Sequence, residues 1–70
     1  MKNYYYEVHI FYSKNDGYSK FFKQNKPLDD EKEIINEAII EFPEIWYDIE
    51  MCDYAVEITE ENYNRATADL

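Results

Sequence analysis

Two side chains with the chemistry of catalytic or metal-ligating groups occur once each in this sequence, His9 and Cys52. His9 falls within an aromatic stretch whose pattern predicts a strand, and the spacing identifies no partner for it. Cys52 has no histidine or basic residue close by in the sequence that would lower the pKa of its thiol and make it a nucleophile. We therefore expect His9 to be structural and Cys52 to be a small buried apolar side chain.

A group of acids surrounds Cys52, and carboxylates are ligands that Ca²⁺ and Mg²⁺ prefer. The group consists of Asp48, Glu50, Asp53 and Glu57. It lacks the central glycine of a calcium-binding loop, so we interpret it as surface charge. The sequence also lacks the spacing of a catalytic triad, a phosphate-binding loop or a zinc site. We predict that the protein is not an enzyme and uses no cofactor, no metal and no small-molecule substrate.

A second set of acids recurs at helical spacing and forms what we call the acidic ridge: Asp30, Glu33, Glu37, Glu41 and Glu44. Like charges four residues apart on a helix cost about 0.2–0.5 kcal/mol per pair. One interpretation is a solvated face that keeps a small protein in solution, and the other is a docking face for a basic partner. Mimicry of nucleic acid would need the acids at 48–61 to join the ridge, because one ridge is sparser in charge than a DNA strand.

Charge is distributed unevenly along the chain, which has 70 residues and a formal net charge of −9. Residues 1–26 carry five lysines and two acids, whereas residues 27–70 carry fourteen acids against Lys32 and Arg65. Overall acidity argues against direct binding of nucleic acid, which normally needs a broad basic face. We see neither a signal peptide nor an apolar run of membrane-spanning length, and a lone cysteine fits a reducing compartment. We therefore expect a cytoplasmic protein.

Residue periodicity predicts strands at 3–13, 18–24 and 52–58. A turn at residues 15–17, with Gly17 at positive φ, would join the first two strands as a hairpin. A three-residue loop there pairs Ile10 with Phe22 and Phe11 with Phe21, whereas a two-residue turn would shift the pairing by one. Either choice leaves aromatic side chains on both faces of the hairpin.

The helices are predicted from their caps. Asp29 or Asp30 should begin a helix that Pro43 ends near Glu41 or Phe42. Thr59 should cap a short C-terminal helix whose Tyr63 and Ala66 can lean back on the sheet. Residues 44–51 are ambiguous between a loop, a helical turn and a strand. The apolar stripe of the first helix consists of Ile34, Ile35, Ala38, Ile39 and Phe42.

These elements predict a single small α+β domain over residues 1–70, with the order β-β-α-β. A right-handed crossover would set the third strand beside the first, giving a three-stranded antiparallel sheet in the order 2-1-3. The long helix would cover one face and leave Tyr5, Phe11 and Phe21 on an open one, and exposed apolar patches usually mark interaction sites. Trp46 and Tyr47 would extend that surface or seal the core, and we favour sealing because so short a chain has a marginal core.

Three segments carry a family likeness and together cover most of the chain: YYYEVHIFYSKNDGYS, LDDEKEIINEAI and DYAVEITEENYN. In this layout the sequence resembles small uncharacterised accessory proteins carried on phages and conjugative elements of low-GC bacteria. The resemblance implies an accessory or host-modulating role, including inhibition of restriction and CRISPR systems. It carries over no active-site residues.

We therefore expect a regulatory module that binds another protein or itself, as a homodimer. The open aromatic face would make the contact, and the acidic ridge would supply charge complementarity. The alternative is an acidic inhibitor that mimics nucleic acid and occupies the nucleic-acid-binding groove of a host or defence protein. In neither case do we expect a membrane partner or direct binding of nucleic acid.

Overall fold

The computed structural model of the protein describes residues 2–13 and 16–68. The elements in chain order are β1 (Tyr4–Ser13), β2 (Asp16–Gln24), α1 (Glu31–Glu41), the 3₁₀ helix η1 (Pro43–Met51), β3 (Cys52–Ile58) and α2 (Glu60–Thr67). β1 pairs antiparallel with both other strands, so the order across the sheet is β2-β1-β3. This confirms the predicted α+β fold and the predicted strand order.

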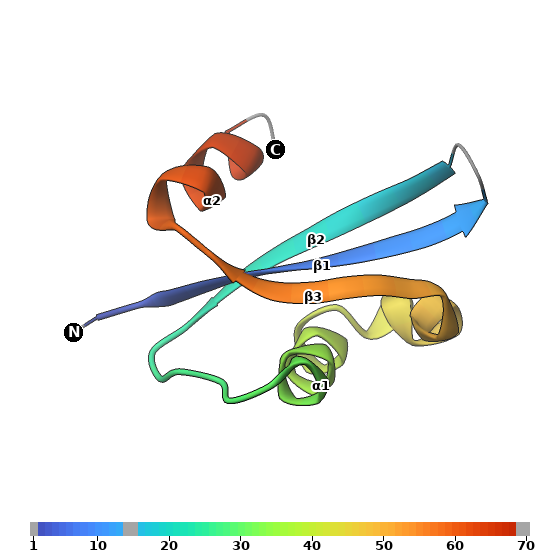
Figure 1. The fold of residues 1–70 in the computed structure, drawn as a ribbon, viewed down its shortest axis with the longest axis horizontal. Helices are drawn as coiled ribbons and strands as arrows, with labels where there is room; N and C mark the ends of the chain where they lie inside the picture. Colours follow the sequence, from blue (N-terminus) through green and yellow to red (C-terminus); the bar gives the residue numbers. More distant parts are fainter. Residues whose placement is uncertain (1, 14–15, 69–70) are drawn as a thin grey trace.

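Helices of unequal extent lie on the two faces of the sheet (Figure 1). α1 and η1 lie on one side, which we call the core face, and α2 lies on the opposite side, the outer face. α2 reaches only the end of the sheet where β1 begins and β3 ends. Within the described part of the chain, no helix lies over the hairpin end of the outer face.

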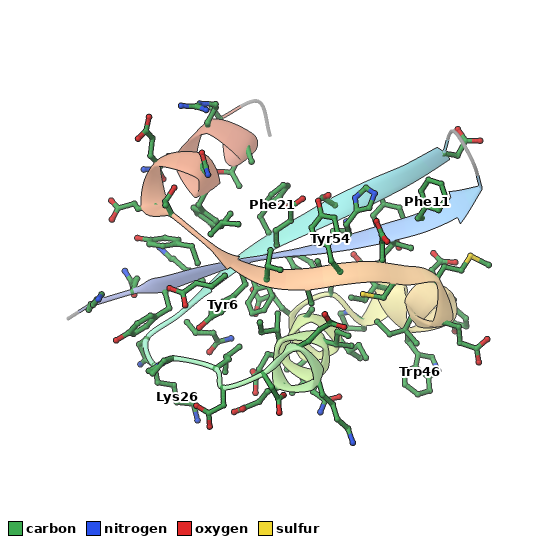
Figure 2. The ribbon with its side chains drawn as sticks, in the orientation of Figure 1. Tyr6, Phe11, Phe21, Lys26, Trp46 and Tyr54 are labelled. Carbon is green, nitrogen blue, oxygen red and sulfur yellow. The ribbon has the colours of Figure 1, made fainter. Side chains whose placement is uncertain are left out.

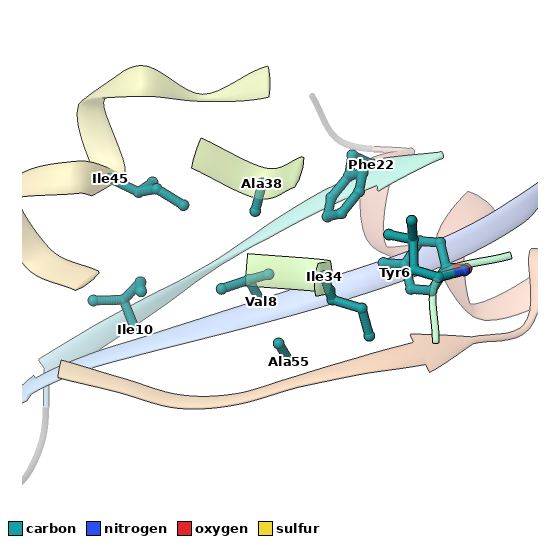
Figure 3. Packing of buried hydrophobic residues seen from close by; sticks show 9 residues of the cluster. Tyr6, Val8, Ile10, Phe22, Ile34, Ala38, Ile45 and Ala55 are labelled. Atoms are coloured by element: carbon teal, nitrogen blue, oxygen red, sulfur yellow. The ribbon is translucent and has the colours of Figure 1, made fainter. Parts of the chain in front are cut away.

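The core lies between the core face and the α1–η1 layer (Figure 3). Side chains alternate along β1, and on the inward-facing side Tyr6, Val8 and Ile10 are fully buried. Ile34 and Ala38 meet them from α1. The other buried apolar residues are Phe22, Leu28, Ile45 and Ala55. So small a core leaves the free energy of folding sensitive to single substitutions.

The hairpin register differs from both predicted registers. Ile10 pairs with Tyr18 and Phe11 pairs with Gly17. The three-residue loop had predicted Phe22 and Phe21 as their partners, so each observed partner lies four residues earlier in the chain. Because side chains alternate with a period of two, an even shift keeps each of them on its expected face. The face assignments are therefore right although the pairing is wrong.

Gly17 has a different role from the predicted one. It belongs to β2 and does not take positive φ, so the predicted turn is wrong there, while Asn15 lies outside the described residues. A Cβ at Gly17 would lie 2.6 Å from the carbonyl oxygen of Ile10 and 3.3 Å from Cα of Phe11. Only glycine fits this close approach of the two strands, which lies next to an irregularity in the β1–β2 register.

α1 begins and ends as predicted. Asp30 is the N-cap, and its carboxylate accepts a hydrogen bond from the backbone N–H of Glu33 at 2.9 Å. The Glu33 carboxylate in turn accepts one from the backbone N–H of Asp29 at 3.0 Å. The helix ends at Glu41, two residues before Pro43, whose ring and missing N–H are incompatible with a helix interior. The remaining stripe residues pack partly buried against the core: Ile35, Ile39 and Phe42.

Residues 44–51, which the sequence left ambiguous, belong to η1, which begins one residue earlier at Pro43. Ile45 is fully buried, and Ile49 packs against the core. Trp46 is 62% exposed and Tyr47 is 88% exposed, so the expectation that they seal the core is wrong. A helix with three residues per turn presents few positions to the core, and here the isoleucines occupy them. Figure 2 shows Trp46 pointing away from the sheet.

Candidate interaction surfaces

α2 covers one end of the outer face. Thr59 caps it, as predicted, by accepting a hydrogen bond from the backbone N–H three residues later at 3.1 Å. The Tyr63 ring lies on the Tyr5 ring, with centroids 4.8 Å apart, and Ala66 lines a cavity of about 180 Å³ together with Phe21. Tyr5 and Phe21 are consequently half-buried. The expectation that nothing covers this face is wrong at this end.

On the part of the outer face that α2 does not reach, four side chains form what we call the open patch: His9, Phe11, Tyr54 and Val56. Phe11 is 44% exposed and Val56 is 40% exposed, while His9 and Tyr54 are half-buried. His9 lies directly opposite Tyr54 in the β1–β3 register. Figure 2 shows Phe11 and Tyr54 on the same side of the sheet. Of the three aromatic residues predicted for this face, Phe11 lies in the patch.

A hydrogen-bond network links side chains of the outer face. The Glu7 carboxylate accepts hydrogen bonds from the hydroxyls of Ser19 and Tyr54, each at 2.9 Å. His9 Nδ1 lies 2.9 Å from the Ser19 hydroxyl oxygen. Because Ser19 donates its single hydrogen to Glu7, His9 Nδ1 must be the donor in the second bond. The His9 ring also stacks on Tyr54, with centroids 5.2 Å apart and an interplanar angle of 15°.

The network holds the rings in place and does not activate a nucleophile. His9 donates to Ser19 instead of accepting from it, which is the reverse of the arrangement in which histidine activates serine. Burial raises the pKa of Tyr54, and the hydrogen bond to Glu7 and its negative charge raise it further. Tyr54 therefore remains a neutral donor at physiological pH. Side chains ordered in advance lose less entropy when a partner binds.

The acidic ridge lies along α1, and four of its five carboxylates are engaged within the chain. Asp30 and Glu33 complete the N-terminal cap described above. Glu37 accepts a hydrogen bond from a glutamine side chain of β2 at 3.4 Å, and Glu44 lies 3.5 Å from the ammonium group of a β2 lysine. Glu41 is exposed. The ridge therefore offers a partner less unpaired charge than its spacing indicated.

The second acidic group does not form a metal site. Across residues 2–13 and 16–68, no three His, Cys, Asp or Glu side chains come together in a group that could hold a metal ion. Asp48 instead accepts a hydrogen bond from the Tyr18 hydroxyl at 3.0 Å. Both residues line a shallow cavity of about 440 Å³ between β2 and η1, as does the ion pair between Lys20 and Glu44.

Cys52 is half-buried beside the core, so it is less enclosed than expected. Its thiol faces the backbone carbonyl of Tyr54 at 3.6 Å. Burial raises the pKa of the thiol, and the negative charges of Glu31 and Asp53 add to the effect. Such a thiol is less nucleophilic at neutral pH than an unperturbed one.

Sequence reasoning missed His9, Tyr54 and Val56 as surface residues. The alternation of residues 52–58 already placed Tyr54 and Val56 on one side of the strand. The missing information was the β1–β3 register, which sets them opposite His9 and Glu7. Predicting it would have required knowing where the irregularity between His9 and Ile10 falls.

Among the described residues, none of the helices has both the length and the apolar character needed to cross a membrane. Comparison of the chain with protein-family models, with curated proteins and with solved structures found no match. The function is therefore inferred from the fold and from the surfaces described above.

Proposed function

We propose that the protein is a non-enzymatic regulatory module that binds protein through the open patch, and that its partner there is a second copy of the chain. One observation carries this proposal: two exposed apolar side chains, Phe11 and Val56, flank rings fixed by a hydrogen-bond network on the same sheet face. Ordered aromatic and apolar groups of this kind are typical of interface cores.

The charge around the open patch favours a second copy. The patch contains no lysine, arginine or free carboxylate, since the nearby carboxylate of Glu7 already accepts two hydrogen bonds. The net charge of −9 resides largely on the helical part of the chain, so patches can meet without bringing the most acidic regions together. A standard interface buries about 800 Å² per partner, which is about one-sixth of the 5137 Å² surface of this chain.

Self-association would also enlarge a small core. A domain of this size usually needs an additional source of stability, and oligomerisation is a common one. Packing the open patch against its copy would create a second apolar layer on the outer face, with the sheets about 10 Å apart. The exposed carboxylates of the acidic ridge, Glu41 among them, would stay outside and give the dimer charge complementarity to a further, basic partner.

The setting proposed for this module is the cytoplasm, where a lone cysteine stays reduced. The resemblance of the sequence to accessory proteins of phages and conjugative elements supports a regulatory or host-modulating role there.

Sedimentation equilibrium tests the proposal. The wild-type chain should show a mass that rises toward the dimer with concentration, and Phe11→Asp should hold it at the monomer. Ile40→Asp is the matched control, because it adds the same charge at a side chain that is 70% exposed on α1, across the sheet from the patch. A wild-type chain that remains monomeric at high concentration, or an equal effect of both substitutions, would contradict the proposal.

The alternative function is an acidic inhibitor that mimics nucleic acid, and the charge distribution supports it. From residue 33 to residue 64 the sequence contains ten acids and no lysine or arginine. The test is a pull-down from bacterial lysate in which a captured protein is identified and then challenged with DNA. Displacement by DNA and loss of capture by Glu37→Gln/Glu41→Gln would support mimicry, whereas capture that survives both would contradict it.

A further inference from the structure

We propose that η1 and the end of α1 form a docking surface for an arginine-rich segment of another protein. We call this surface the acidic–aromatic strip, and it consists of Ile40, Glu41, Glu44, Trp46, Tyr47 and Glu50. It lies across the sheet from the open patch (Figures 1 and 2). The inference is independent of self-association, because no residue belongs to both surfaces.

The apolar side chains of the strip are exposed although the segment that carries them is anchored. Ile45 follows Glu44 and precedes Trp46 and Tyr47 in the sequence. It is fully buried and fixes η1 to the core. Trp46 is nevertheless 62% exposed, Tyr47 88% and Ile40 70%. Trp46 and Tyr47 therefore turn outward from an anchored segment, and exposed apolar surface of this kind is typical of interaction sites.

The charges around these rings select the partner. Glu41, Glu44 and Glu50 are all exposed. At a rise of about 2 Å per residue in a 3₁₀ helix, Glu44 and Glu50 lie within about 8 Å of Trp46 along the axis, which is about one Debye length at physiological salt. One cation, Lys20, pairs with Glu44 at 3.5 Å. The strip is therefore negative where its rings are exposed.

Arginine is the side chain that this combination fits best. Its planar guanidinium stacks on the faces of Trp and Tyr and forms paired hydrogen bonds with carboxylates, whereas lysine does neither as well. Nucleic acid and anionic lipid would be repelled by the same carboxylates. A second copy of this chain would bring like charges together at the strip, so the occupant is a different, basic protein.

Binding of short oligoarginine and oligolysine peptides of equal length tests the inference. Fluorescence anisotropy of the labelled peptides gives both affinities at physiological salt, and Phe11→Asp is used as the background so that self-association does not contribute. We expect oligoarginine to bind several-fold more tightly than oligolysine. Trp46→Ala and Tyr47→Ala should each weaken oligoarginine binding about two- to fivefold, and the conservative changes to Phe should restore most of it.

A matched control separates stacking from general charge. Glu60→Gln/Glu61→Gln removes two exposed carboxylates from α2, on the other side of the sheet, and should weaken binding less than the change at Trp46 does. Because both rings are exposed, the alanine variants should keep the wild-type circular dichroism spectrum. Equal affinities for the two peptides, or alanine variants that bind like the wild type, would show only diffuse electrostatic attraction and overturn the inference.

Discussion

The hydroxyl of Tyr6 is the polar group on which stability should depend most clearly. Tyr6 is fully buried, and its oxygen accepts a hydrogen bond at 2.9 Å from the backbone N–H of Leu28, which is itself 9% exposed. Tyr6→Phe keeps the ring and its stacking on Phe22 (Figure 3). It leaves the Leu28 N–H in the interior without an acceptor, which costs about 1–3 kcal/mol. For a domain of this size we expect the melting temperature to fall by about 10 °C.

The assay is urea unfolding followed by far-UV circular dichroism. Fluorescence would be a weaker probe, because Trp46 is already exposed in the folded state. Tyr5→Phe is the control, since it removes the same oxygen from a half-buried ring that lies on Tyr63, and it should change the unfolding free energy by less than about 0.5 kcal/mol. If Tyr6→Phe were as mild as Tyr5→Phe, the stability of the fold would not depend on the hydrogen bond between the Leu28 N–H and the Tyr6 hydroxyl.

Three further predictions concern pH, charge and packing. Burial raises the pKa of the Tyr54 hydroxyl above 10.0 and of the Cys52 thiol above 9.0, so the folded state keeps protons that the unfolded chain releases. The urea concentration at the unfolding midpoint should therefore stay constant below about pH 9 and fall as the pH rises further. The fall should be less steep in Tyr54→Phe, and a midpoint that stays constant to about pH 11 would contradict the prediction. Glu41→Lys places a cation in the last turn of α1, which has no basic residue. It should raise the unfolding free energy by about 0.5–1 kcal/mol. Thermal melts measure the change, and a lower melting temperature would contradict the prediction. Gly17→Ala forces a methyl group against the Ile10 carbonyl and should lower the unfolding free energy by about 1–3 kcal/mol, so a neutral result would mean that the strands can separate there at little cost.

The fold could be predicted because local signals agreed with one another. Asp30 and Thr59 capped helices where their side chains indicated, and Pro43 ended α1. Alternation in residues 3–13 separated the core residues from those of the outer face, so face assignments were correct even where the register was not. These signals act over a few residues, and so a single sequence contains them.

The surfaces depended on contacts that local patterns do not specify. The register of the β1–β2 hairpin was predicted wrongly because Gly17 is a typical turn residue. In the structure it lies in β2 and, having no side chain, allows the two strands to approach closely. The direction of Trp46 was missed because hydrophobicity alone does not say which side of a short helix meets the core. Tyr63 and Ala66 were expected to lean on the sheet, but their covering of Tyr5 and Phe21 was not predicted, because α2 has no fully buried residue that would mark where it lies.

The position of β1 between its two neighbours determines when the protein can fold. One neighbour, β2, follows immediately in the chain, but the other, β3, begins only at Cys52, after both α1 and η1. An isolated hairpin is at best marginally stable in water, so β1 and β2 become stable only once β3 has also been synthesised. On the ribosome the aromatic side chains of β1 would stay uncovered until residues 52–58 had emerged. Until then they form exposed apolar surface of the kind that makes folding intermediates prone to aggregation.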